Sequence, residues 1–167
     1  MEVAENPFAQ IPKWLEAFAQ ENSGLLGQVH DLALRRQKEK KNEMPWTVYL
    51  ESIAVGRGFA IEKVVAFISR FHNYQIVPLN INLIEPKDYS EYFPNEILET
   101  YYAMPISLNE TFLNIALLEP EVARKVSEAY YDWIGERRLK ALQFFITTPT
   151  AFTQAHGILM RIQSRNR

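Results

Sequence analysis

The chain has 167 residues, of which 47% are hydrophobic, so it can bury one full core or two small lobes. Its 18 basic and 20 acidic residues nearly cancel, which leaves no global field to attract nucleic acid or an anionic membrane. Because it has no cysteine, a disulfide framework and a thiolate metal site are both excluded.

The first 73 residues show a helical period. Apolar residues recur at i, i+3, i+4 and i+7 on one face of a helix that begins near Pro12, namely Ile11, Trp14, Leu15 and Phe18. Further helices are predicted at about 25–40, 46–53 and 61–71. The last of these has so many apolar positions that neighbours should cover most of its circumference.

Basic residues gather at 35–41, the end of the second predicted helix. Such a run could contact a phosphate backbone, but cations also stabilise the C-terminus of a helix through its dipole. Because the total charge is nearly neutral, we interpret the run as a solvated helix end.

From Tyr74 onward, strands alternate with helices. A short strand over 75–79 precedes two helices that start at prolines, at 86–89 and 94–101. Two strands, 104–108 and 112–117, then flank the polar pair Asn109-Glu110, which predicts a β-hairpin with a two-residue connection.

The remaining segment adds a helix, a strand and a helix. The first helix runs from Pro120 to about residue 134 and ends at Gly135, the strand spans 142–146, and Pro149 starts the last helix. The predicted fold class is therefore α+β. A helical N-terminal lobe, 1–73, is followed by a small mixed-sheet lobe, 74–167, of order β-α-α-β-β-α-β-α.

Five short elements occur in a fixed order within 74–160. Each alone is weak, because a proline followed by an acidic residue is simply good chemistry for a helix start. Their order and spacing are more specific. This stretch resembles the second half of the N-terminal domain of type II secretion and type IV pilus assembly ATPases, including MshEN domains. The likeness is looser over 25–73. The elements are Ile84-Glu85-Pro86-Lys87, Phe93-Pro94-Asn95-Glu96-Ile97, Tyr101-Tyr102-Ala103-Met104-Pro105-Ile106, Leu113-Asn114-Ile115-Ala116-Leu117-Leu118-Glu119-Pro120, and the strand and helix at 142–146 and 149–160.

The resemblance implies a non-catalytic adaptor domain that docks on the cytoplasmic part of an inner-membrane assembly protein and so places the ATPase motor at the membrane. We expect no cofactor, no nucleic-acid partner and no direct membrane insertion. No apolar run approaches the ~20 residues of a membrane span, and no basic-then-apolar leader opens the chain, so we expect a soluble cytoplasmic protein held at the inner membrane only through a protein partner. Aromatic residues supply large contact area, and Trp14 and Phe18 are the candidates for partner binding.

Some members of this family bind cyclic di-GMP through tandem segments with Leu-Gly pairs and a later glutamine. Here Trp46-Thr47 stands at the second pair and Phe71 stands near the glutamine, so bulky groups occupy positions where the flat ligand would approach the backbone. Arg57 in Gly56-Arg57-Gly58 could still bind a guanine base or phosphate, although the same residues fit a turn between helices. A cyclic di-GMP sensor therefore stays open as the alternative, as does a free-standing regulator.

No catalytic constellation emerges. The sequence has no Gly-x-x-x-x-Gly-Lys-Ser/Thr loop, and its three histidines are far apart without ligand-like spacing. Glu119 and Glu121 flank Pro120 at a predicted helix start, where acidic groups complement the dipole rather than form an acid/base pair. We predict that the chain is not an enzyme and has no metal or catalytic site.

Overall fold

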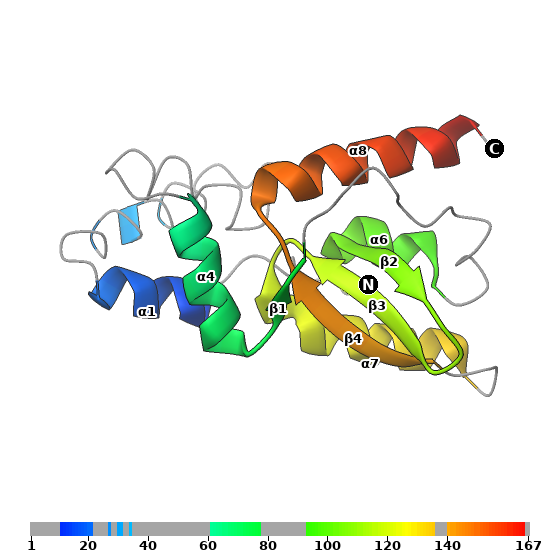
Figure 1. The fold of residues 1–167 in the computed structure, drawn as a ribbon, viewed down its shortest axis with the longest axis horizontal. Coiled ribbons are helices and arrows are strands. Elements are labelled where there is room, and N and C mark those ends of the chain that lie inside the picture. Colours follow the sequence, from blue (N-terminus) through cyan, green and yellow to red (C-terminus); the bar gives the residue numbers. More distant parts are fainter. Residues whose placement is uncertain are drawn as a thin grey trace. The chain divides into compact units, whose positions relative to one another are not determined.

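The computed structural model describes residues 11–21, 27, 30–31, 34, 61–77, 93–135 and 140–165. The chain divides into two compact units, Met1–Asn73 and Tyr74–Arg167 (Figure 1). The predicted helices at 46–53 and 86–89, the basic run at 35–41 and Arg57 lie outside the described residues.

The helical unit contains α1 (Lys13–Glu21) and α4 (Ile61–His72) among its described residues. The carbonyl of Pro12 accepts the backbone N–H groups of Leu15 and Glu16, so α1 begins at the predicted proline. The two helices bury an apolar stripe each, made of Trp14, Leu15, Phe18 and Ala19 on α1 and of Val64, Val65 and Ile68 on α4.

The second unit is built on a four-stranded sheet in the order β1-β4-β3-β2. Strands β2 and β3 are antiparallel, whereas β4 runs parallel to both β3 and β1. The predicted small mixed sheet and the α+β class are therefore confirmed. The strands are β1 (Gln75–Ile76), β2 (Ala103–Leu108), β3 (Phe112–Leu117) and β4 (Ala141–Ile146).

The hairpin between β2 and β3 has three connecting residues, 109–111, and not the predicted pair. The side chain of Asn109 explains the extra residue. Its Oδ1 accepts the backbone N–H groups of Thr111 at 2.9 Å and Phe112 at 2.7 Å, an arrangement in which an amide side chain replaces a backbone turn. The backbone N–H of Asn109 donates to the carbonyl of Phe112 at 3.0 Å and closes the loop.

The crossover from β3 to the parallel strand β4 begins with a single turn of 3-10 helix, η3 (Pro120–Val122), and continues as α7 (Ala123–Ile134). A parallel connection needs such a crossover, because a tight turn cannot return the chain to the same end of the sheet. Gly135 ends α7, as predicted, with φ 57° and ψ −128°.

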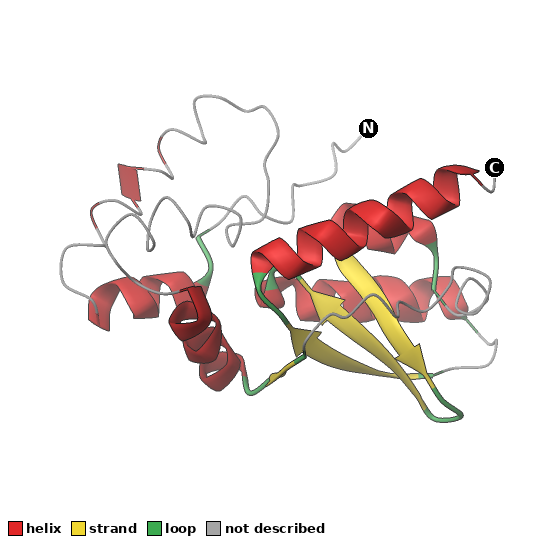
Figure 2. Ribbon diagram, turned by 45° about the horizontal axis from the view of Figure 1, so that its top comes forward, coloured by secondary structure: helices red, strands yellow, loops and turns green. Residues whose placement is uncertain are grey.

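Two helices cover one face of the sheet. Figures 1 and 2 both show α6 (Asn95–Tyr101) and α7 on the same face. The core of this unit holds Leu113, Ile115 and Leu117 from β3, Val126, Tyr130 and Ile134 from α7, and Phe93 stacked on Tyr130 with ring centroids 6.4 Å apart. The described elements of the unit follow the order β1, α6, β2, β3, α7, β4, α8.

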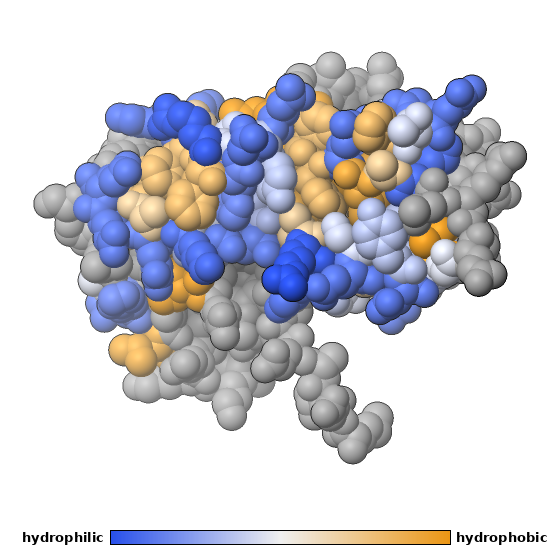
Figure 3. Space-filling view, turned by 90° about the horizontal axis from the view of Figure 1, so that it is seen from below, coloured by the Kyte–Doolittle hydropathy of each residue, from blue (hydrophilic) through white to orange (hydrophobic). Residues whose placement is uncertain are grey.

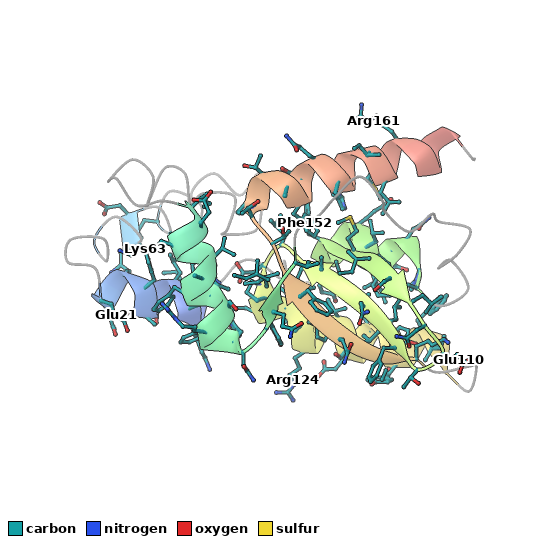
Figure 4. All side chains as sticks on the ribbon, in the orientation of Figure 1. Glu21, Lys63, Glu110, Arg124, Phe152 and Arg161 are labelled. Carbon is teal, nitrogen blue, oxygen red and sulfur yellow. The ribbon has the colours of Figure 1, made fainter. Side chains whose placement is uncertain are left out.

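The last helix, α8 (Pro149–Arg165), starts at the predicted proline. Thr148 precedes it, and its Oγ1 accepts the backbone N–H of Ala151 at 3.3 Å, as an N-cap side chain does. Phe152 points inward from the first turns of α8, whereas Arg161 points away from the unit (Figure 4).

Candidate functional site

The two residues predicted to bind a partner are both buried in the helical unit. Trp14 is 0% exposed and Phe18 is 3% exposed. The expectation that they form an exposed surface is therefore wrong. Their spacing on the apolar stripe of α1 was a core signal, because residues at i and i+4 share the face that packs against a neighbour.

An exposed aromatic surface does exist on the same pair of helices, and α4 supplies it. Phe71 is 44% exposed and stacks on the half-buried Phe67 with ring centroids 6.2 Å apart. Phe67 in turn meets the buried Phe18 edge-on at 5.3 Å, and Phe71 meets the imidazole of His72 edge-on at 5.0 Å. We call Phe67, Phe71 and His72, backed by Phe18, the α4 aromatic row.

The position of the aromatic row follows from where α4 ends. Asn73 adopts φ 58°, a left-handed conformation that asparagine tolerates and that stops a helix. Phe71 lies in the last turn, three residues after the buried Ile68, so it continues the apolar stripe at the end of the helix. The prediction that neighbours cover most of α4 is therefore wrong at Phe71.

Basic side chains lie at the end of α4 that carries the row. Arg70 and His72 occupy the last turn of α4, whereas Glu62 is in its first turn, at the opposite end. Figure 3 shows an apolar area on the helical unit with hydrophilic side chains around it. Phe71 is already held by its stack on Phe67, so its side chain loses little freedom when a partner binds. This surface therefore suits a protein partner.

The signal that could have located the surface was already in the sequence. Phe67 and Phe71 are spaced at i and i+4, and aromatic residues at that spacing contact each other on one helix face. The packing of α4 against α1, with the helix ending at Asn73, determines that the second ring is left uncovered.

Two titratable side chains of the second unit are perturbed. Burial lowers the pKa of His156, and the backbone of Leu98 and the carboxylate of Glu99 partly oppose that shift. The imidazole lies between the rings of Tyr102, at 5.3 Å, and Phe152, at 5.7 Å. Burial also raises the pKa of Tyr74, and the carboxylate of Glu121 adds to the effect. Both side chains pack against aromatic rings, so we interpret them as structural groups and not as an acid/base pair.

The carboxylate of Glu119 caps the helix start at Pro120. Glu119 is 2% exposed, precedes η3, and accepts the backbone N–H of Glu121 through Oε1 at 3.3 Å. Glu119 thus has a structural role at this helix start. Among the residues that the structure describes, no cluster of three or more His, Asp or Glu side chains could hold a metal ion, and no helix is long and apolar enough to cross a bilayer.

The cyclic di-GMP alternative depends mainly on residues outside the described ranges, since Trp46-Thr47 and Arg57 all fall there. The one described position is Phe71, which the sequence placed near the glutamine of the binding relatives. In this chain the position carries an exposed phenyl ring that belongs to the aromatic row.

No protein-family model and no curated protein sequence matches the chain. Several solved structures resemble it, among them the following two. A structure of MshE with cyclic di-GMP has a TM-score of 0.58 at 12% identity, and the likeness covers 89% of this chain and 99% of that one. The N-terminal domain of XpsE has a TM-score of 0.48 at 14% identity, over 89% of this chain and 97% of that one. The chain therefore shares its fold with the MshE structure, in agreement with the resemblance to MshEN domains over 74–160.

Proposed function

We propose that this chain is a non-catalytic adaptor of a type II secretion or type IV pilus assembly system. In this role it docks on the cytoplasmic part of an inner-membrane assembly protein and positions an ATPase motor there. The observation that carries the proposal is the fold shared with MshE over 89% of the chain. The ordered sequence elements over 74–160 support the same family independently of the fold.

The α4 aromatic row is the surface that we assign to this docking. Residues that carry much of the binding energy at protein interfaces are typically aromatic or arginine, and Phe71 and Arg70 are adjacent on the last turn of α4. Phe71 is supported from behind by Phe67 and, through it, by Phe18. Trp14 and Phe18 thus contribute by shaping the helix pair and not by direct contact.

Capture of partners from the source cell tests the proposal. The 167-residue chain, fixed to a resin, should retain an inner-membrane assembly protein that mass spectrometry identifies. Phe71→Ser should reduce this capture at least tenfold, because loss of a central aromatic contact typically costs about 2 kcal/mol or more of binding. Tyr131→Ser is the matched control, since Tyr131 is 48% exposed on the other unit.

Three results would count against the assignment. If Tyr131→Ser and Phe71→Ser reduced the capture of an assembly protein equally, the interface could not be assigned to the aromatic row. Failure to recover any assembly protein would remove the adaptor role itself. Magnesium-dependent ATP turnover by the purified chain would contradict the non-catalytic assignment, because its sequence lacks the loop that holds a triphosphate.

A cyclic di-GMP sensor is the second candidate, because the MshE structure of the same fold contains that ligand. Titration calorimetry with cyclic di-GMP separates the two roles. We expect weak binding or none, since Phe71 and Trp46-Thr47 replace smaller or amide-bearing residues of the binding relatives. A dissociation constant near ~1 μM, about 8 kcal/mol of binding, that Arg57→Ala abolishes would establish the sensor.

A further inference from the structure

Among the strands that the structure describes, the neighbours of β4 pair with its outer edge along only part of its length. Strand β1 lies beside the C-terminal end of β4, where Gln75 is opposite Phe145 and Ile76 is opposite Ile146 (Figure 1). On the other side, β3 pairs with all six residues of β4. Within the described residues, no strand pairs with the outer edge of β4 from Ala141 to Phe144.

The hydrogen bonds that β4 makes on its two sides identify which of its backbone groups have no described strand opposite them. The N–H of Ala141 donates to Thr111 on the β3 side, whereas the carbonyl of Ile146 accepts from Val77 on the β1 side. Because successive residues of a strand point their backbone groups to alternate edges, Leu142 and Phe144 face outward together with Ile146. The N–H and C=O of Leu142 and the N–H of Phe144 are therefore directed at the unpaired edge.

Both ends of this unpaired stretch are closed. At the N-terminal end, the backbone N–H of Lys140 donates to the hydroxyl of Tyr130 at 2.9 Å. At the C-terminal end, β1 begins, because the left-handed Asn73 turns the chain out of α4 immediately before Tyr74. The gap between these two closures is about four residues, roughly 13 Å at ~3.3 Å per residue.

The side chains beside the gap differ between the two faces. Leu142 and Phe144 are half-buried and share a face with the buried Ile146, and Phe144 contacts Tyr74 with ring centroids 6.1 Å apart. Ala141 and Gln143 are exposed on the opposite face. A segment that fits the gap would thus place apolar side chains on the first face and polar ones on the second.

We propose that the gap at Ala141–Phe144 is a binding site for one short extended peptide segment of a partner, added to β4 in line with β1. Main-chain hydrogen bonds to Leu142 and Phe144 supply the attraction, and the alternation of apolar and polar side chains supplies the selectivity. The site uses none of the residues of the α4 aromatic row, and it does not depend on the adaptor role.

A second copy of the chain is a poor occupant, and β1 is the reason. Antiparallel pairing of two β4 edges over this stretch would bring the residues that precede β4 in one copy opposite Phe145 and Ile146 of the other. That place on the edge is already taken by Gln75 and Ile76. The gap therefore admits a single extended strand. It does not admit the β4 edge of a second copy, because β1 is already paired to that edge.

The test uses the 167-residue chain and a synthetic hexapeptide of alternating valine and threonine, blocked at both ends. In an NMR titration to millimolar peptide, the amide signals of Leu142 and Phe144 should shift saturably, and their hydrogen exchange should slow about tenfold at saturation. Two further peptides are N-methylated, one at every valine and the other at every threonine. Only one set of N–H groups can face β4, so one of these peptides should bind as the parent does and the other at least tenfold more weakly.

Leu142→Pro removes one outward N–H without breaking a bond to β3, as proline at a sheet edge allows, and should weaken the parent peptide at least tenfold. Phe71→Ser should leave peptide binding unchanged. Unshifted Leu142 and Phe144 signals, or equal binding of the two methylated peptides, would overturn the proposal even if Leu142→Pro failed to fold. Dimerisation of the chain that Leu142→Pro abolishes would assign the edge to a second copy instead.

Discussion

The hydroxyl of Tyr130, at 0% exposure inside the core, accepts the backbone N–H of Lys140 at 2.9 Å. This contact joins α7 to the residue before β4. The same Lys140 extends its Nζ to the carbonyls of Asn109 at 2.7 Å and Glu110 at 2.9 Å, so it also holds the hairpin loop. One residue thus fixes the start of the central strand to two separate elements.

We expect Tyr130→Phe to lower the free energy of unfolding by about 1–2 kcal/mol, because the ring stays buried while the N–H of Lys140 loses its partner. Tyr131→Phe is the control. Its ring is 48% exposed, so the same change should cost less than about 0.5 kcal/mol. Urea denaturation of the two variants measures the difference, and equal losses would show that the hydrogen bond contributes nothing specific.

The two glycines 135 and 157 should respond to alanine with opposite signs. Gly135 has φ 57° and ψ −128°, a conformation that a residue with a Cβ adopts only with strain, so Gly135→Ala should destabilise by about 1–3 kcal/mol. Gly157 lies inside α8, and nothing lies within 4 Å of the position that a Cβ would take, so Gly157→Ala should stabilise by about 0.5–1 kcal/mol. Thermal unfolding of both variants checks the pair, and a shared sign would contradict this account of the backbone.

The stacked imidazole of His156 should make stability depend on pH. Burial lowers its pKa in the folded state, so the unfolded chain binds a proton first as the pH falls below about 6.5. Stability should therefore be complete above that pH, decline as the pH falls toward the lowered pKa, and then level off. The Glu99 carboxylate and the Leu98 backbone oppose the effect and reduce its size.

His156→Phe tests that dependence, because a phenyl ring keeps the stack on Tyr102 and Phe152 but cannot titrate. Unfolding midpoints in urea, measured at pH 7.5 and 5.5 at constant ionic strength, should differ less in this variant than in the parent chain. An unchanged difference would assign the pH dependence to other groups.

The burial of Trp14 makes a prediction about the helical unit. Trp14→Ala should destabilise by about 3–5 kcal/mol, because it removes a large, fully buried side chain. Phe71→Ala should cost much less, since its ring is already 44% exposed. Hydrogen exchange of α1 and α4 amides distinguishes them. Comparable losses of protection in the two variants would mean that Phe71 is a core residue.

Much of the second unit could be predicted from its local chemistry. Pro120, Gly135 and Pro149 marked helix ends, because proline fixes φ at a helical value and glycine tolerates a positive φ. The structure starts η3 and α8 at the two prolines and ends α7 at Gly135. The hairpin was visible as two apolar runs around a polar turn. Its third loop residue was missed because the turn depends on the side chain of Asn109, which contacts backbone groups two and three residues later.

The candidate surface could not be predicted in the same way. Trp14 and Phe71 are both aromatic residues on apolar helix faces, and only the packing of α1 and α4 decides that one is covered and the other is not. The part of β4 that no described strand pairs with on its outer side was equally invisible. It depends on α4 running to His72, so that β1 begins only at Gln75, and on the parallel register that places Gln75 and Ile76 beside Phe145 and Ile146.

The parallel position of β4 between β3 and β1 orders events during synthesis. The hairpin of β2 and β3 closes over three residues, so it can form as soon as Leu117 has left the ribosome. Gln75 has no neighbour in the sheet until Phe145 is made, 70 positions later by their numbers. A nascent chain thus carries β1 without its neighbour β4 while 70 further residues are added. Contacts between residues so far apart in sequence form slowly, because a long loop must close first.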